Sequence, residues 1–550
     1  MHRKIRSIAI KLRRLITYRY SVTATERDLM RRFSRFKTRV PGRCVPRVLV
    51  ECVEELSLFC ILGEVVSALQ ARGPLLVEQY CCRCFRAESS RSLRRYIGMA
   101  IEVNGLSDRK WKRLFGSYCN RTAFSAAGFI TPWRSIAYFL KAWRIVHGVR
   151  SVDELVALKL LGIPVGDLVI DSFLRFKPSP EVNLRDPYLV MVVRQALKLM
   201  DLCQSYFTQH CPDLYLCNYA TYVQHGIPVR VALKYGVRVQ AFCSTTQEFS
   251  IRITPDHATH TKQVDNYYKE FLELPKKEEK LRIARDTLEK RLSGGIDVAL
   301  AYMRSSAYAD NGDQVPDVNG AAVIFLHDFY DSPHGYRWML FHEFLSWVRF
   351  TLGVLTEAGL PVFVKPHPNQ ISVSMREIEQ LKREFPSAKF ISSQISNRQL
   401  VEAGMKCAVT VHGSVAAEMA FFGVPTICSG DNPHVAFNFC KVAKTRDGYA
   451  QQLREFPALN HDVVSMREEA CMFYYMHNLN LNKDDREFRD TFMWTWARML
   501  ESQRSQVQDR DQLVKDLDYL VSMPGFRRFA DGLHEYLIQQ EENRWRSHVR

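Results

Sequence analysis

The sequence has no long uncharged hydrophobic run. The longest apolar stretch, residues 48–66, is interrupted by Glu51, Glu54, Glu55 and Glu64. Charges at that frequency exclude a helix that crosses a bilayer. The basic N-terminus also lacks a continuous apolar segment followed by a small-residue cleavage site, so we expect no secretory signal peptide.

A regular cysteine framework is also absent. The 15 cysteines of this 550-residue chain follow no fixed spacing, which in a protein of this size predicts reduced thiols and a cytoplasmic location. One Cys-x-x-Cys motif is formed by Cys81 and Cys84, with Cys82 between them. Neither a second such pair nor a histidine lies nearby in the sequence. We therefore predict no metal site.

Acidic residues are scarce in the first 50 positions, where only Glu26 and Asp28 stand against fifteen Lys and Arg, a net charge of 15 − 2 = +13. The whole chain carries +17, so the other 500 residues contribute about +4. A nucleic-acid-binding body would carry its positive charge on the fold itself. The distribution instead indicates a basic arm on a nearly neutral globular body, and no nucleic-acid partner.

The beginning of this arm has the pattern of a cationic amphipathic helix. Apolar side chains recur at helical spacing, and basic ones fill the positions between them. Such a helix can lie on the inner face of the cytoplasmic membrane, where each basic residue gains about 1 kcal/mol from anionic lipid. The alternative is a helix packed on the body or on a partner. The apolar residues are Ile5, Ile8, Leu12, Leu15 and Ile16, the basic ones are Arg3, Lys4, Arg6, Lys11, Arg13 and Arg14, and Arg31, Arg32, Arg35, Lys37 and Arg39 continue the basic character.

The whole chain divides into four parts. We expect a basic arm at 1–45, a first lobe at 46–311 that begins with a strand at 48–51, a second lobe at 312–450, and a charged helical extension at 451–550. Residues 85–210 have mostly helical patterns, a strand is expected at 213–217 and another at 237–242, and helices at 271–311 are expected to join the lobes.

The second lobe has the most regular pattern. Short apolar strands alternate with amphipathic helices over about 110 residues, which predicts a parallel sheet covered on both faces, a Rossmann-like unit. Ligands of such sheets bind at the carboxyl ends of the strands. The expected strands are 322–326, 362–364, 389–391, 407–411 and 425–428, and the expected helices are 339–358, 375–385, 397–402 and 415–422.

Two of these strand ends carry polar motifs. Lys365-Pro366-His367-Pro368-Asn369 follows one strand, and its two prolines fix a loop that presents a cation and an imidazole to a phosphate. His412-Gly413-Ser414 follows another strand and starts a helix, where glycine permits close backbone approach and free N–H groups favour an anion. Glu418, one turn later, is placed to accept hydrogen bonds from ribose hydroxyls. Each motif alone can also be a rigid turn or an ordinary helix cap; together they predict a nucleotide site.

The pair KPHPNQ and HGSVAAEMAFFGVP resembles the nucleotide-binding lobe of bacterial capsule and lipopolysaccharide glycosyltransferases, the group that includes Kdo transferases and bacterial sialyltransferases. The resemblance covers about residues 320–450 and is thin in the first lobe. It implies a GT-B fold, with two Rossmann-like lobes facing a cleft, and a CMP-activated sugar such as Kdo. It places His367 on the donor phosphate, Ser414 beside it and Glu418 on the ribose. His327, Asp328 and His334 match polar positions at the first strand end of this lobe in the family and are further expected contacts.

Sugar transfer needs a group that deprotonates the acceptor, or a carboxylate nucleophile. Asp167 and Asp171, two acids in an apolar segment of the first lobe, are the candidates, although a helix cap and a solvated acid explain them as well. His225, Arg230, Asp256 and His257 are weaker acceptor-side candidates. No Asp-x-Asp sequence occurs near the proposed sugar pocket, so we expect neither a metal nor a cofactor.

Three other functions fit the same sequence. A nucleotide-sugar 2-epimerase shares the fold and the loop chemistry but needs no basic arm. A polymerase that transfers polyol phosphate from a CDP-alcohol pairs a similar His loop with a Ser-rich helix start. A scaffold for polysaccharide assembly without catalysis is the non-enzymatic alternative. The main interpretation is a glycosyltransferase that acts on a glycan or lipid-linked acceptor at the membrane surface.

Overall fold

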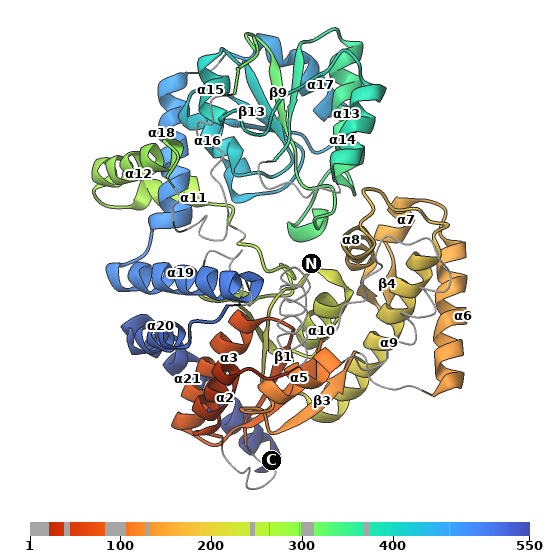
Figure 1. The fold of residues 1–550 in the computed structure, drawn as a ribbon, viewed down its shortest axis with the longest axis vertical. Helices are drawn as coiled ribbons and strands as arrows, with labels where there is room; N and C mark the ends of the chain where they lie inside the picture. The colour runs from red at the N-terminus through yellow and green to blue at the C-terminus, as the bar shows by residue number, and fades with distance from the viewer. Residues whose placement is uncertain are drawn as a thin grey trace, which may run out of the picture.

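The computed structural model of the chain describes residues 21–37, 45–82, 106–126, 131–242, 248–262, 264–295, 298, 308, 313–367, 374–460, 462–505 and 507–549. The amphipathic helix expected within residues 3–16 lies outside this part of the chain, as do Cys84 and Asn369. Two α/β lobes make up the molecule, with C-terminal helices running from one to the other (Figure 1).

The first lobe is built on a six-stranded sheet of order β3-β2-β1-β6-β7-β8, in which only β8 runs antiparallel to its neighbour. The chain starts at the central strand β1, builds outward on one side and then returns to the other. The strands are β1 (Arg47–Cys52), β2 (Leu76–Cys81), β3 (Arg121–Ser125), β6 (Leu214–Cys217), β7 (Arg238–Ala241) and β8 (Ile251–Ile253).

Side chains of this sheet alternate between two hydrophobic cores because successive residues of a strand point to opposite faces. Val48 and Val50 of β1 pack with one cluster, and Leu49 between them packs with the other. Helices α2 (Ala24–Ser34), α3 (Leu56–Arg72) and α5 (Leu106–Phe115) cover the first face. The second face is covered by α6 (Pro132–Gly148), α7 (Val152–Val156), α8 (Gly166–Phe176), α9 (Pro187–His210) and α10 (Tyr222–Lys234), next to a small hairpin of β4 (Lys159–Leu160) and β5 (Ile163–Pro164).

The second lobe has an all-parallel sheet of order β11-β10-β9-β12-β13-β14. The order reverses at β9, so the crevice between the ends of β9 and β12 is where such a sheet binds ligands. The strands are β9 (Ala322–Phe325), β10 (Val362–Lys365), β11 (Lys389–Phe390), β12 (Cys407–Thr410), β13 (Thr426–Cys428) and β14 (Cys440–Val442). Its helices are α13 (Phe344–Glu357), α14 (Met375–Glu384), α15 (Asn397–Glu402), α16 (Val415–Phe421) and α17 (Arg446–Glu455), with α11 (Tyr267–Glu273) and α12 (Lys277–Leu292) packed beside them. The predicted α/β class with two Rossmann-like lobes is confirmed.

The C-terminal helices connect the lobes. Helix α18 (Val463–Tyr474) packs on α12 and α16 of the second lobe and continues into a π-helical turn, Tyr475–Leu479. The chain then crosses to the first lobe, where α19 (Lys483–Ser505), α20 (Arg510–Ser522) and α21 (Pro524–Val549) pack against α3 (Figure 1). The predicted helical extension therefore belongs to both lobes, and the first lobe's core contains residues from both ends of the sequence.

The boundary expected at residue 45 is too late. Helix α2 lies within the predicted basic arm, yet Phe33 is fully buried against α3, and the Glu26 carboxylate forms a buried ion pair with Lys110 at 2.8 Å. Arg32, counted among the basic residues of the arm, binds Glu64 at 2.6 Å. The apolar face of α2 is narrow and surrounded by arginines. The composition of this segment therefore resembles that of a basic arm, although the helix is part of the core.

Other differences are local. Helix α13 begins at Phe344 and not near Met339, because Met339 pairs with Gly430 and the Leu340 N–H donates to the Ser429 carbonyl at 2.9 Å. The segment predicted as mostly helical contains β3, a short strand whose outer residues are exposed. Among the described residues, no helix has the length and apolar character needed to cross a membrane.

Helices α19, α20 and α21 stabilise the first lobe by packing on it, and one substitution in α19 tests this. Phe492 of α19 is fully buried against Phe249, with ring centroids 5.0 Å apart. We expect Phe492→Ala to lower the free energy of unfolding by about 3–5 kcal/mol, since it removes a buried aromatic ring and leaves a cavity. Glu501→Ala, at an exposed position of α19, is the control and should change it by about 0.5 kcal/mol or less. Equal effects in urea unfolding would contradict the packing role.

Candidate functional site

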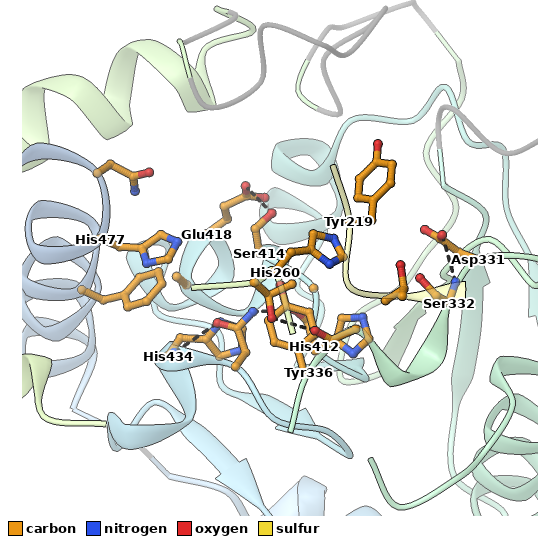
Figure 2. A pocket seen from close by; sticks show the side chains of 18 of the residues that line it. Tyr219, His260, Asp331, Ser332, Tyr336, His412, Ser414, Glu418, His434 and His477 are labelled. Atoms are coloured by element: carbon orange, nitrogen blue, oxygen red, sulfur yellow. Dashed lines mark hydrogen bonds between the residues drawn. The ribbon is translucent and has the colours of Figure 1, made fainter. Parts of the chain in front are cut away.

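A cavity of about 660 Å³ lies between the lobes. This is within the size range of sites for small molecules and cofactors. Residues of the first lobe, of the second lobe and of the crossing helix α19 all line it, so its shape depends on how the two lobes meet (Figure 2). The main polar lining residues are Glu55, Arg175, Tyr219, Tyr222, His260, Arg291, Asp331, Tyr336, His412, Ser414, Glu418, Asn432, His434, His477 and Arg504.

A second, smaller chamber of about 180 Å³ lies at the ends of β9, β10 and β12. Lys365 and His367 from the loop after β10 line it together with Gly413 and Ser414 from the loop after β12. Gly413 and Ser414 also line the larger cavity, so the two chambers adjoin. The structure therefore brings together the two motifs that the sequence singled out, on either side of the central strand β9.

Gly413 stands where any side chain would be crowded. A Cβ atom at this position would lie 2.9 Å from the Thr410 Oγ1 atom and 3.4 Å from a Val415 methyl carbon. The former distance is shorter than ordinary Cβ contacts, so a side chain here would displace the Thr410 hydroxyl from its place beside His327. Helix α16, which follows, has seven residues; the charge of Lys365 is therefore the stronger attraction for an anion here.

Glu418 holds this region together. Its carboxylate is buried and accepts hydrogen bonds from Arg291 Nη2 at 2.5 Å, from the Tyr308 hydroxyl at 2.7 Å and from the Ser414 hydroxyl at 3.3 Å. The ion pair with Arg291 compensates a charge that would be costly to bury alone. Protein donors thus already contact both carboxylate oxygens, and the predicted contact with ribose stays a prediction.

The cationic side of the small chamber comes from Lys365. Its ammonium donates to Asn397 Oδ1, and burial lowers its pKa to about 8, an effect that Glu418 partly opposes. Burial and the neighbouring Lys365 charge also lower the pKa of His367. The pKa of His327 falls well below its usual value because of burial and because His412 lies near. His327 Nε2 lies 3.1 Å from Thr410 Oγ1, and its ring stacks on Phe344.

Neutral histidines surround the larger cavity. Burial lowers the pKa of His260 to about 4 and those of His412 and His477 to about 3. Neutral imidazoles add no charge to the cavity but offer hydrogen bonds to polar ligands. Of the histidines that line the cavity, His412 belongs to a motif that the sequence predicts. His260, His434 and His477 stand alone in the sequence, without a motif around them.

The predicted catalytic acids Asp167 and Asp171 lie on α8, outside the lining of both chambers. Asp167 forms a two-pronged ion pair with Arg230, one of whose contacts is 2.7 Å long. Asp171 is fully buried and binds His334 Nδ1 at 2.6 Å. His334 belongs to the second lobe, so this pair fastens α8 to it. The predicted roles of these acids in catalysis and of His334 in donor binding remain predictions.

The remaining predicted residues have structural partners. His225 Nδ1 lies 2.8 Å from the buried carboxylate of Glu51 on β1. Asp328 accepts from the Tyr330 N–H and the Ser374 hydroxyl, at 3.1 and 3.2 Å, and so shapes the loop after β9. His257 lies in the turn after β8. These three are not part of the lining of either chamber.

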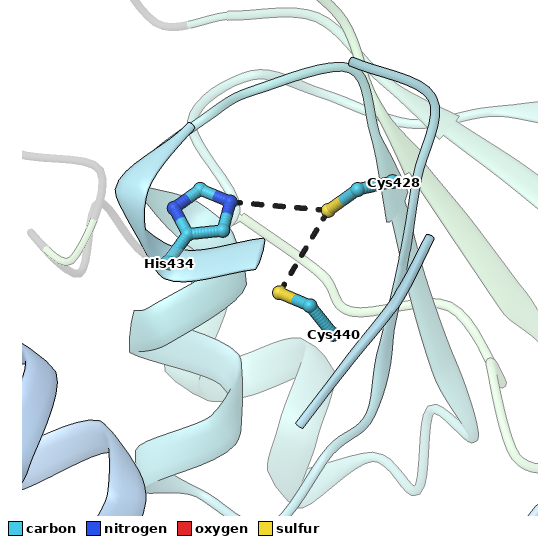
Figure 3. Close-up of side chains that lie close together, drawn as sticks. All are labelled: Cys428, His434 and Cys440. Atoms are coloured by element: carbon cyan, nitrogen blue, oxygen red, sulfur yellow. Dashed lines mark hydrogen bonds between the residues drawn. The ribbon is translucent and has the colours of Figure 1, made fainter. Parts of the chain in front are cut away.

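Cys428, His434 and Cys440 form a compact buried cluster at the ends of β13 and β14 (Figure 3). The Cys428 sulfur lies 3.9 Å from both His434 Nε2 and the Cys440 sulfur. Two thiolates and an imidazole are ligands that Zn²⁺ accepts, but a structural zinc site has four. Glu51, Cys82 and His225 form a second set of three. Within the described part of the chain, neither set provides a fourth ligand.

No family model and no curated protein matches the chain. Similar solved structures include UDP-GlcNAc 2-epimerases from Methanocaldococcus jannaschii, with 10% identity and a TM-score of 0.25 over 76% of this chain and 93% of that one, and from Neisseria meningitidis, with 11% identity and a TM-score of 0.21 over 84% and 99%. A Thermobaculum terrenum O-GlcNAc transferase has 9% identity and a TM-score of 0.25 over 92% and 77%. At TM-scores this low the likeness carries no argument. The sheets and the cleft themselves define a two-lobed α/β protein of GT-B architecture.

The Asp171–His334 pair makes contact between the lobes dependent on pH. Burial opposes the charge on His334, but the Asp171 carboxylate outweighs it and raises the pKa of His334 above its usual 6.5. Between 6.5 and the folded pKa, the folded protein holds a proton that the unfolded chain releases. This contribution of His334 is therefore present below pH 6.5 and is lost as the pH rises through the folded pKa. Burial also raises the pKa of Asp171, so as the pH falls the pair loses its carboxylate charge earlier than a free aspartate would.

A double-mutant cycle of His334→Gln and Asp171→Asn, followed by urea unfolding, measures this coupling. We expect a favourable coupling free energy at pH 6 that decreases at pH 9. The pair of Arg349 on α13 and Glu384 on α14, 2.9 Å apart, is the control, because Glu384 raises the pKa of Arg349 and the pair stays charged across this range. A coupling between His334 and Asp171 that is equal at both pH values would contradict the charged pair.

Proposed function

We propose that the protein transfers a sugar from a nucleotide donor to an acceptor bound between the lobes. The observation that carries this proposal is the meeting of Lys365, His367 and the Gly413–Ser414 turn around one small chamber that adjoins the interlobe cavity. A cation, a neutral imidazole and a hydroxyl fit a phosphate group. The cavity beside them has space for a sugar and an acceptor group, with both lobes as its walls.

The donor phosphate binds in the small chamber and the sugar extends into the cavity. Arg175 and Arg504 line the cavity from the first lobe and from α19, so an acidic sugar or an acidic acceptor finds cationic partners there. This charge distribution agrees with a CMP-activated acid sugar such as Kdo, which the resemblance of the two motifs to capsule and lipopolysaccharide enzymes implies. The acceptor is a glycan or a lipid-linked glycan at the inner face of the bacterial cytoplasmic membrane.

Glu55 is our candidate for the group that takes the acceptor proton. It follows the carboxyl end of β1 in the first lobe, precedes α3 and lines the cavity. Burial raises its pKa, although the Ser57 hydroxyl, which donates to its Oε1 at 2.5 Å, partly opposes the shift. A raised carboxyl pKa makes a stronger base. In the sequence, Glu55 is only one of several charges that interrupt an apolar run.

A substitution of His367 tests the proposed donor site. We expect His367→Ala to reduce donor turnover at least about 100-fold, because it removes a hydrogen bond to the donor phosphate where charge develops, while the melting temperature without ligand changes little. A thermal-shift series with CMP, CDP, UDP and GDP measures binding, since a ligand that binds only the folded protein raises its stability by an amount that grows with the logarithm of the ligand concentration divided by Kd. The shift that CMP gives the native protein should decrease in the variant. His257→Ala is the control; an unchanged CMP shift in His367→Ala would contradict the site.

A substitution of Glu55 tests its proposed role as the general base. Glu55→Gln should lower kcat by about 10²- to 10⁴-fold, the usual contribution of a general base, and leave the thermal shift with nucleotide unchanged. Asp171→Asn is the comparison, because the sequence predicted a catalytic role for this acid. If Asp171→Asn abolishes turnover and Glu55→Gln does not, the base is Asp171 and our assignment is wrong.

Donors labelled in the sugar separate the alternatives. Transfer of label from a CMP-sugar to a glycan supports the proposal, and transfer of polyol phosphate from a CDP-alcohol supports the polymerase. Conversion of a UDP-sugar to its 2-epimer without an acceptor supports the epimerase. Binding of nucleotide with no turnover of any donor would leave the assembly scaffold.

A further inference from the structure

Helix α6 lies along the outer flank of the first lobe, at the right-hand edge of Figure 1. It packs on α9 through a narrow face whose buried residues are Tyr138, Ala142 and Val146. The Tyr138 hydroxyl donates to Asp201 on α9 at 2.7 Å. Only about one third of the helix circumference is therefore used in the fold, and the opposite side faces solvent.

That exposed side is strongly apolar. The described part of the chain has sixteen exposed large hydrophobic side chains, and five of them lie on this one helix of 17 residues. Trp133 is 81% exposed and Trp143 is 47% exposed. Soluble surfaces rarely collect large apolar side chains in this way, and such a patch marks an interaction site. The five, which we call the α6 strip, are Trp133, Ile136, Phe139, Leu140 and Trp143.

Three cations run beside the α6 strip. Arg134, Lys141 and Arg144 are exposed, and α6 contains no acidic residue. At about 100° per residue, the α6 strip covers one part of the exposed arc and the three cations cover the part next to it, with the buried face opposite. Acids near this helix are occupied: Asp201 accepts from Tyr138, and Glu154 accepts from the Arg150 N–H.

We propose that α6 is a second membrane-binding element, which inserts the α6 strip into the headgroup region of an anionic bilayer. Tryptophan favours this depth because its ring is apolar and its N–H is polar. A helix with an aromatic apolar side and a basic side lies in the interface, about 5–10 Å deep, and the cations contact anionic lipid. A second copy of this chain suits the site less well, since a two-fold contact between identical helices would bring three like charges on each side together.

This element goes beyond the proposed chemistry and does not depend on it. It is also separate from the N-terminal arm, because α6 is part of the folded first lobe. Two weak attachments reinforce each other, because the second binds at the high local concentration that the first creates. With α6 on the membrane, the first lobe has a fixed orientation to the bilayer, which the arm alone cannot give.

The test is co-sedimentation of the full chain with vesicles of phosphatidylcholine that contain roughly 30% phosphatidylglycerol, which gives the vesicle surface a negative potential. The double variant Trp133→Ala/Trp143→Ala should bind at least about tenfold less tightly, because the two indole rings that insert into the bilayer are lost. The triple variant Arg134→Gln/Lys141→Gln/Arg144→Gln should also weaken binding and reduce its dependence on salt. Circular dichroism and thermal melting check that each variant is folded.

Matched controls distinguish α6 from other surfaces. Val464→Ala, at the exposed start of α18, and Arg376→Gln/Lys382→Gln/Arg383→Gln, on the mixed-charge helix α14, should bind like the native chain. A variant without residues 1–20 should keep residual binding, and adding Trp133→Ala/Trp143→Ala to that truncated chain should remove it. The proposal is overturned if the tryptophan variant binds vesicles like the native chain, or if the native chain is a dimer that this variant dissociates. Donor turnover with a soluble acceptor, measured in parallel, reports on the proposed sugar transfer independently.

Discussion

The buried ion pair between Glu418 and Arg291 is the interaction on which the site depends. Arg291 comes from α12, which precedes the second sheet, and Glu418 comes from α16, which leaves β12 at the ligand-binding edge. The pair fastens these helices together, and Glu418 in turn accepts from the Ser414 hydroxyl. Removal of either partner would leave an uncompensated buried charge at the junction of the two chambers. The position of Ser414 beside His367 and Lys365 follows from this pair and from the parallel sheet.

The cavity exists because the chain crosses between the lobes. Helix α19 supplies Trp496 and Arg504 to its lining, and α8 reaches the second lobe through Asp171 and His334. Further contacts between the lobes are also polar: His342 Nε2 lies 2.8 Å from Asp153, and the Val182 N–H donates to Glu343 at 2.6 Å. Interfaces of this kind permit the lobes to change their relative orientation, which a site with walls from both lobes needs for donor entry and product release.

The regular alternation after residue 321 was enough to predict the second sheet and the proximity of its two polar motifs, because the ends of parallel strands meet at one edge. Helix α2 and strand β3 were missed, since arginines hide the apolar face of one and the other is short and largely exposed. Glu55, His260 and Arg291 could not be found in the same way. Each is a single polar residue whose position depends on tertiary packing, and nothing in its sequence neighbourhood distinguishes it from a surface residue. Asp171 was predicted for its apolar surroundings, and these reflect burial beside His334.

The docking of α19, α20 and α21 on α3 has a consequence for biosynthesis. Since residues near the N-terminus and residues beyond Lys483 share one hydrophobic core, the lobe that leaves the ribosome first is completed last. An apolar face of α3 stays exposed while more than 200 further residues, including the whole second lobe, are translated. The nascent first lobe is therefore a natural client for chaperones, and truncated or stalled products of this chain should be prone to aggregation.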